Sequence, residues 1–269
     1  MKVIKKLIVL ITIVSFTGIF LLGCRLGERQ EETKIRVMAA ASLTEVYDEL
    51  KEEFEREYPA IEVELNYAAS QTLANQIMSG VSADIFASAN LEHMEDLSKQ
   101  GLVDDFDIFA YNELAIAVFN QVEGIESLED LISLDYRLIV ADVSTPIGRY
   151  TRDFLARVEN SEKFPVDYSN QFLEAVVSQE LDVKSVLAKI ELGEVDAGVV
   201  YRTDIKAADE EKIDVLEIPT EYNVLASYPV SILAGINQEK REASEKFLDY
   251  LYSEAGRAIL EQYGFLIEN

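Results

Sequence analysis

Serine hydroxyls placed where predicted strands give way to predicted helices are the feature of this sequence best suited to chemistry. Ser42 follows three alanines after an apolar strand at 35–38, and Ser70 follows two alanines after an alternating strand at 61–65. A helix N-terminus offers unpaired N–H groups and the positive end of the helix dipole, which together bind an anion without any cationic side chain. The alternative is that both serines only cap their helices.

The same pattern continues further along the chain. A strand at 137–142 runs into Val143–Gly148, where a proline and a glycine mark a loop before another helix. Asp182 to Lys184 opens a further helix, and Tyr201 ends an apolar strand at 195–201. The loop at 143–148 is therefore a third place where backbone donors could meet a ligand.

Other residue types offer little for catalysis. His93 is the only histidine, and without nearby cysteines or paired carboxylates we expect it to lie on the surface. The chain has no Gly-x-Ser-x-Gly elbow, no cysteine pair and no His-bearing metal motif. We therefore expect no enzyme, although carboxylates are numerous enough to keep a surface-anchored α/β enzyme using paired carboxylates as an alternative.

Composition limits the partners. The chain has 269 residues, a net charge of −26 and 49% hydrophobic residues, enough for one large domain or two lobes. Strong acidity argues against nucleic acid and anionic lipid surfaces as partners. An anionic ligand would have to be held by local dipoles, because the overall field repels it.

The N-terminus has the pattern of an export signal. Lys2, Lys5 and Lys6 precede an apolar run from Leu7 to Leu22, and Leu-Leu-Gly-Cys ends it at Cys24. This end resembles the bacterial lipobox, so we expect residues 1–23 to be a lipoprotein signal peptide, Cys24 to be lipidated, and 24–33 to be a tether. An ordinary signal peptide and an uncleaved anchor are the alternatives. The expected location is the outer face of the cell membrane in a Gram-positive type of envelope.

Predicted strands and helices alternate through the rest of the chain, which indicates an α/β fold with mostly parallel sheets. The helix after the first strand has one apolar face, formed by residues at helical spacing: Leu43, Val46, Tyr47, Leu50 and Phe54.

Five segments occur in a characteristic order: Ala39–Thr44, Ala69–Ala74, Ala83–Ala89, Gly198–Tyr201 and Tyr263–Phe265. Together they resemble the molybdate-binding proteins of bacterial ABC importers, from about Lys34 to Ile267. The resemblance implies a two-lobed periplasmic-binding-protein-like fold of type II with crossing hinge strands near 112–114 and 227–229. Lobe 1 would comprise 34–112 and 228–269, and lobe 2 would comprise 113–227.

The resemblance also implies a binding site for a tetrahedral oxyanion, with no catalytic residue, no cofactor and no metal ligand beyond the oxyanion itself. Ser42 and Ser70 would donate hydroxyl and backbone N–H groups, Ile147 and Val183 would donate backbone N–H groups, and Tyr201 its phenolic hydroxyl. Ile147 replaces an alanine common in relatives, which a backbone donor tolerates. Whether Arg149 also reaches the anion is left open.

The expected function is to capture molybdate, and also tungstate, and deliver it to the permease of an ABC importer, with the protein acting as a monomer. A site made only of donors selects a fully deprotonated oxyanion, unless Asp142 or Asp182, which are near in sequence, supplies an acceptor. Cavity size would then separate molybdate from sulfate. A carrier for another oxyanion such as sulfate, and a ligand-sensing or adhesive surface protein, are the further alternatives.

Overall fold

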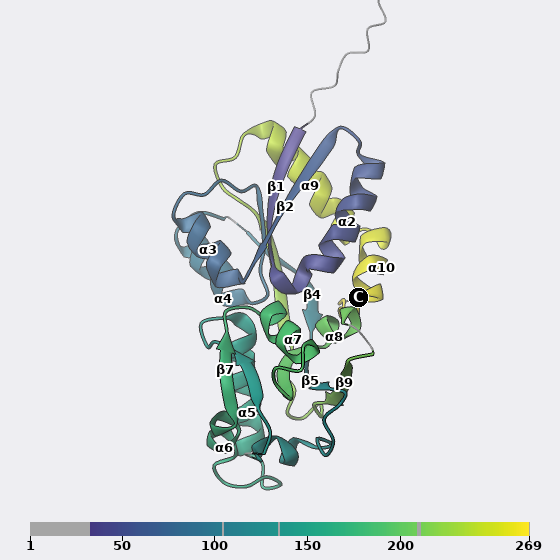
Figure 1. Cartoon of the computed structure of the whole chain (residues 1–269). Helices are drawn as coiled ribbons and strands as arrows, with labels where there is room; N and C mark the ends of the chain where they lie inside the picture. Colours follow the sequence, from purple (N-terminus) through teal and green to yellow (C-terminus); the bar gives the residue numbers. More distant parts are fainter. Residues whose placement is uncertain (1–32, 104, 134, 209–210, 269) are drawn as a thin grey trace, which may run out of the picture. The chain divides into compact units, whose positions relative to one another are not determined.

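The computed structural model describes residues 33–103, 105–133, 135–208 and 211–268. They form two five-stranded sheets with helices packed on them (Figure 1). The predicted signal peptide, Cys24 and all of the predicted tether except Thr33 lie outside the described residues. None of the helices in the described ranges is both long and apolar enough to cross a membrane.

The first sheet has the strand order β2-β1-β3-β10-β4. Its strands are β1 (Thr33–Ala40), β2 (Ile61–Ala68), β3 (Ile85–Ala87), β4 (Asp107–Asn112) and β10 (Ala226–Ile232). Its helices are η1 (Ala41–Leu43), α2 (Thr44–Glu57), α3 (Ser70–Met78), α4 (Leu91–Lys99), α9 (Gln238–Tyr252) and α10 (Glu254–Gln262). Alternate β1 residues face opposite sides, so Val37 packs in the core with α2 and Met38 with α3. We call this sheet and its helices lobe 1.

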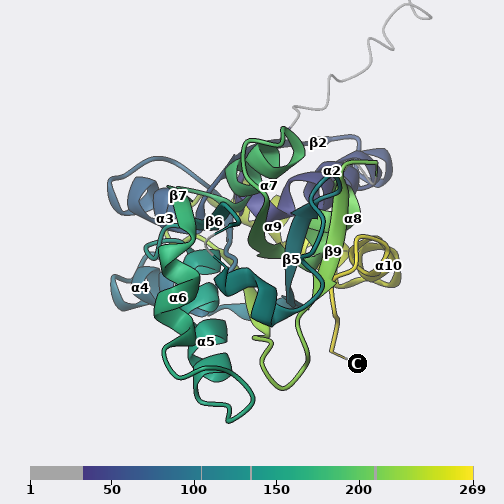
Figure 2. The same cartoon turned by 60° about the horizontal axis from the view of Figure 1, so that its bottom comes forward.

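The second sheet has the strand order β7-β6-β8-β5-β9. Its strands are β5 (Leu114–Phe119), β6 (Leu138–Ala141), β7 (Val176–Glu180), β8 (Ala197–Tyr201) and β9 (Ile213–Glu217). Its helices are η2 (Leu128–Ile132), α5 (Pro146–Glu159), α6 (Tyr168–Glu174), α7 (Val183–Glu191) and α8 (Arg202–Ala207). Figure 2 shows α5 and α6 on one side of these strands and α7 on the other. We call this sheet and its helices lobe 2.

The α/β class is as predicted, but the sheets are not mostly parallel. Among the named strands, four pairings are parallel and four are antiparallel. In each sheet one strand runs against both of its neighbours, β10 in lobe 1 and β5 in lobe 2. These two strands lie where the chain passes between the sheets: β5 follows β4 directly after Glu113, and β10 follows β9. The predicted lobe boundaries remain predictions; the one at 227/228 falls inside β10.

The apolar face predicted for the first helix is confirmed, since its five residues are all buried, although Leu43 belongs to η1. The prediction for His93 is wrong, because its exposed fraction is only 7%. Helical spacing places His93 beside Leu97 on the inner face of α4, and both are buried. Burial lowers the pKa of the His93 imidazole, which favours its neutral form.

Candidate functional site

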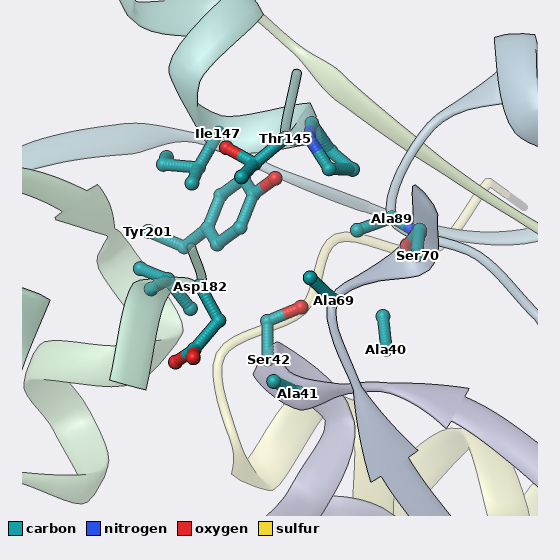
Figure 3. A pocket seen from close by; sticks show the side chains of 12 residues that line it. Ala40, Ala41, Ser42, Ala69, Ser70, Ala89, Thr145, Ile147, Asp182 and Tyr201 are labelled. Carbon is teal, nitrogen blue, oxygen red and sulfur yellow. The ribbon is translucent and has the colours of Figure 1, made fainter. Parts of the chain in front are cut away.

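A small cavity lies where strand ends of both lobes meet (Figure 3). Its volume, taken as the space open to the centre of a water molecule, is about 20 Å³. It is lined by Ala40, Ala41, Ser42, Ala69, Ser70, Ala89, Thr145, Pro146, Ile147, Asp182, Val183 and Tyr201. All five residues predicted to hold an anion are therefore brought together around one cavity, and neither Arg149 nor Asp142 is among the lining residues. That the five residues bind an anion stays a prediction.

Helix N-termini supply the backbone donors around this cavity. Ser70 and Val183 are the first residues of α3 and α7, and Ile147 is the second residue of α5. The first N–H groups of a helix have no partner inside the helix and carry the positive end of its dipole. The termini of α3, α5 and α7 therefore offer partial positive charge to the cavity from both lobes.

Two side chains cap α5 and α7, and the first backbone N–H group of each helix stays without a partner in the helix. Thr145 Oγ1 accepts from the backbone N–H of Gly148 at 3.0 Å, and Asp182 Oδ1 accepts from that of Ser185 at 2.8 Å. Each cap satisfies the N–H of the third residue of its helix. The N–H groups of Ile147 and Val183 precede the capped ones and remain available to a ligand.

The serine side chains are not helix caps, so that alternative is wrong. The N-cap residues are Ala40 for η1 and Ala69 for α3, and neither makes a side-chain cap. Instead the Tyr228 hydroxyl donates to Ser42 Oγ at 3.1 Å, and the Ala89 N–H donates to Ser70 Oγ at 3.0 Å. Because each serine oxygen accepts a hydrogen bond, its own proton is left to donate elsewhere.

Tyr201 brings a phenolic hydroxyl to the cavity from the end of β8. Its side chain is buried, and its hydroxyl oxygen has no hydrogen-bond partner among the described residues. Burial raises the pKa of Tyr201 well above the ordinary value, and nearby Tyr228 raises it further. The hydroxyl therefore stays protonated near neutral pH and can donate to an anion.

Carboxylates near the cavity are engaged elsewhere. Asp182 lines the cavity, but its two oxygens accept from Ser185 N–H at 2.8 Å and Ser185 Oγ at 2.9 Å. In Figure 3 its carboxylate points away from the Tyr201 hydroxyl. Asp142 Oδ1 accepts from the backbone and hydroxyl of Ser144, which holds the pKa of Asp142 below its usual value. The carboxylates of both aspartates therefore already accept hydrogen bonds within their own segments of chain.

Cations lie outside the lining and pair with carboxylates across the two lobes. Arg149 of α5 forms an ion pair with Glu92 of α4, and its Nε donates to Val143 O at 3.3 Å. Lys184 of α7 pairs with Glu45 of α2 at 2.7 Å and with buried Asp204 at 3.1 Å. No lysine or arginine belongs to the lining residues, and the described ranges hold no group of three or more His, Cys, Asp or Glu placed to bind a metal ion.

Three participants were not named among the site residues expected from the sequence. Thr145 has a readable signal, because a threonine directly before proline and three residues before glycine is a helix-start pattern. Asp182 has the same signal, as an N-cap before Ser185. Tyr228 has no local signal, since its contact with Ser42 joins residues 186 positions apart.

Two α/β lobes meet around a small cavity lined by small residues, helix N-termini, two serines and a tyrosine. Residues 35–266 match the family described as "Bacterial extracellular solute-binding protein". The chain belongs to this family.

Individual relatives agree with the resemblance read from the motifs. ModA of Mycobacterium tuberculosis, a molybdate-binding protein, is 32% identical over 241 residues, covering 89% of this chain and 87% of its own. YvgL of Bacillus subtilis, named as an inferred ABC transporter substrate-binding lipoprotein, is 29% identical, covering 90% and 89%. The predicted resemblance to bacterial molybdate-binding proteins is thus confirmed.

Solved structures agree with the fold. One from Clostridium difficile, described as the substrate-binding domain of an inferred molybdenum ABC transporter, has a TM-score of 0.65 at 27% identity, covering 88% of this chain and 100% of that one. The sulfate-binding protein SubI of Mycobacterium tuberculosis has a TM-score of 0.77 at 17% identity, covering 87% and 86%. At that identity the likeness to SubI concerns the fold alone.

Proposed function

We propose that this protein captures molybdate, and also tungstate, outside the cell membrane and delivers it to the permease of an ABC importer. Ser42 and Ser70 donate hydroxyl and backbone N–H groups to the anion, Ile147 and Val183 donate N–H groups, and Tyr201 donates its hydroxyl. The protein binds its ligand and releases it chemically unchanged.

The observation that carries this proposal is that the cavity presents hydrogen-bond donors. Both serine oxygens already accept hydrogen bonds, and burial keeps Tyr201 protonated. The groups turned to the cavity are therefore donors, backed by helix N-termini. A fully deprotonated oxyanion offers only acceptors and matches these donors, whereas a protonated one brings a proton of its own that competes with them.

The size of the cavity favours an inorganic ion. The space open to the centre of a water molecule is only about 20 Å³, so the cavity is small. An organic phosphate would need several times that space. A compact tetrahedral ion, surrounded on all sides by donors, is the ligand class that fits with least rearrangement.

Among compact tetrahedral ions, the relatives support molybdate over sulfate as the ligand. The protein at 32% identity is a molybdate-binding protein, while the sulfate-binding SubI shares only the fold. Both ions are tetrahedral dianions, so the lining alone does not separate them. Tungstate is included because its size is nearly that of molybdate.

The anchoring part of the proposal rests on the sequence. Lipidated Cys24 would hold the mature chain to the outer face of the membrane, and the name of YvgL, a relative at 29% identity, includes the same kind of anchor. Metabolic labelling with a fatty-acid analogue tests this. The full-length chain should be labelled and membrane-bound, and Cys24→Ser should lose both properties.

Isothermal titration of the mature chain with molybdate, tungstate, sulfate and phosphate tests the ligand. We expect tight one-to-one binding of the first two and no saturable binding of phosphate. Ser70→Ala should weaken molybdate binding by about 10- to 150-fold, since one charge-assisted hydrogen bond contributes about 1.5–3 kcal/mol. Ser244→Ala is the matched control, because Ser244 is also fully buried but lies in α9 outside the cavity. Preference for sulfate would overturn the ligand, and absence of binding would overturn the function.

A further inference from the structure

We propose that Tyr228 is a positioning residue that forces the Ser42 hydroxyl to donate into the cavity, and so helps to exclude protonated oxyanions. This inference rests on the proposed function. Tyr228 does not line the cavity itself, and acts on a ligand only through Ser42.

A chain of buried hydrogen bonds leads to Ser42 from the strands that connect the lobes. Asn112 Nδ2 at the end of β4 donates to Tyr228 Oη at 3.3 Å, and Tyr228 Oη in β10 donates to Ser42 Oγ at 3.1 Å. Asn112 and Tyr228 are fully buried, and Ser42 is 6% exposed. Bulk water therefore offers little competition for these bonds.

The direction of this chain is fixed at its start. Asn112 Oδ1 accepts from the N–H of Glu113 at 3.0 Å, which sets the orientation of the amide. Its Nδ2 group can only donate, so Tyr228 Oη accepts there and must direct its own proton onward. That proton goes to Ser42 Oγ, which accepts it at 3.1 Å. The Ser42 hydroxyl then donates its own proton toward the cavity.

Ser42 and Ser70 differ in the group that makes each hydroxyl oxygen an acceptor and so leaves its proton to donate. The donor to Ser70 Oγ is the backbone N–H of Ala89, which no side-chain change can reverse. The donor to Ser42 Oγ is a hydroxyl, which can act in either sense. Whether the Ser42 hydroxyl donates into the cavity thus depends on Tyr228, and the direction of the Tyr228 hydroxyl depends on Asn112.

The same chain also joins the two lobes. Asn112 Nδ2 donates to Thr203 Oγ1 of α8 in lobe 2 at 2.7 Å, as well as to Tyr228. A serine that faces the cavity from lobe 1 is therefore linked, through two residues of the connecting strands, to a side chain of lobe 2.

Packing alone is the competing role for Tyr228. Its ring makes edge contacts with the rings of Phe109, Tyr201 and Phe265, with centroids 6.2, 5.9 and 5.3 Å away. Tyr228→Phe keeps that ring and removes only the hydroxyl. The matched control is Tyr168→Phe, because the buried Tyr168 hydroxyl donates to Leu128 O at 2.6 Å in lobe 2, outside the cavity.

The experiment is a double-mutant cycle of Tyr228→Phe and Ser42→Ala, titrated with molybdate and with phosphate. Tyr228→Phe should weaken molybdate binding about three- to tenfold, the range for one neutral hydrogen bond, and less than about twofold when Ser42 is already alanine. Its phosphate affinity should rise relative to molybdate, because Ser42 Oγ becomes free to accept. Tyr168→Phe should change neither affinity.

Each contrary outcome has a distinct meaning. Unchanged molybdate affinity in Tyr228→Phe, an equal loss with and without Ser42, or an unchanged molybdate-to-phosphate ratio would each overturn the positioning role while leaving the ligand intact. If the wild-type chain bound no molybdate, the proposed function would fail and this inference with it. Thermal unfolding of each variant without ligand confirms that the folded protein is being compared.

Discussion

Removing the hydroxyl of Tyr201 should change stability and ligand affinity in opposite directions. That hydroxyl is buried at the cavity and has no hydrogen-bond partner among the described residues. Tyr201→Phe keeps the aromatic contacts with Tyr150 and Tyr228, whose ring centroids lie 6.5 and 5.9 Å away. The substitution therefore removes one polar atom and almost nothing else.

The magnitudes follow from what that atom does in each state. A buried polar group without a partner costs about 1–3 kcal/mol, so the free energy of unfolding of the free protein should stay equal or rise by about 1 kcal/mol. With an anion bound, the hydroxyl would donate a charge-assisted hydrogen bond of about 1.5–3 kcal/mol. Losing it should weaken molybdate binding by about 10- to 150-fold.

The assay combines denaturant unfolding of the ligand-free protein with titration of molybdate. Tyr168→Phe is again the control: it loses a 2.6 Å hydrogen bond to Leu128 O, so it should lower stability by about 1 kcal/mol and leave affinity unchanged. A Tyr201→Phe variant that is less stable yet binds molybdate normally would refute the reasoning, because the hydroxyl would then serve the fold.

Three further predictions concern charge. Lys184→Met should lower the free energy of unfolding by about 3–5 kcal/mol, because it leaves Asp204 buried without its cation. Burial raises the pKa of Asp204, so the native state of the variant takes up a proton at a higher pH than the unfolded state does, and chemical denaturation should show a smaller loss in acid than at neutral pH. Asp196→Asn should lower the free energy of unfolding by about 1 kcal/mol, because the carboxylate loses hydrogen bonds with Arg137. Burial raises the pKa of Asp196, but these hydrogen bonds outweigh burial and hold the pKa below 3.8. The extra stability of the wild type should therefore be present above pH 3.8 and disappear as the pH falls through the lowered pKa. Molybdate affinity should stay constant from neutral pH to about pH 9.5, since burial raises the pKa of Tyr201 above the ordinary value of about 10; a tenfold loss in that range, seen by titration, would show that the phenol ionises.

Much of the fold was predictable because apolar periodicity is a local property. The face from Leu43 to Phe54 follows directly from spacing. Strand direction is not local, so the antiparallel placement of β10 and β5 could not be read from the same pattern. His93 was misjudged because a single polar residue was weighed by its type, while its helical spacing to Leu97 places it on the buried face.

The candidate site was partly predictable for a related reason. Its five predicted residues each stand at or just after the end of a strand or at the start of a helix, positions that sequence reveals, and the topology brings these ends together. The residues that decide whether the Ser42 hydroxyl donates or accepts could not be predicted in this way. Tyr228 and Asn112 reach Ser42 through long-range packing, and no local pattern marks a buried tyrosine as a donor to one particular serine.

The most direct test of the central claim is a crystal structure of the mature chain grown with molybdate, with diffraction recorded at the molybdenum absorption edge. The account predicts one strong anomalous peak inside the cavity, within hydrogen-bond distance of its oxygens from Ser42, Ser70, Ile147, Val183 and Tyr201. A peak elsewhere on the protein, or no peak at a saturating concentration of molybdate, would contradict it.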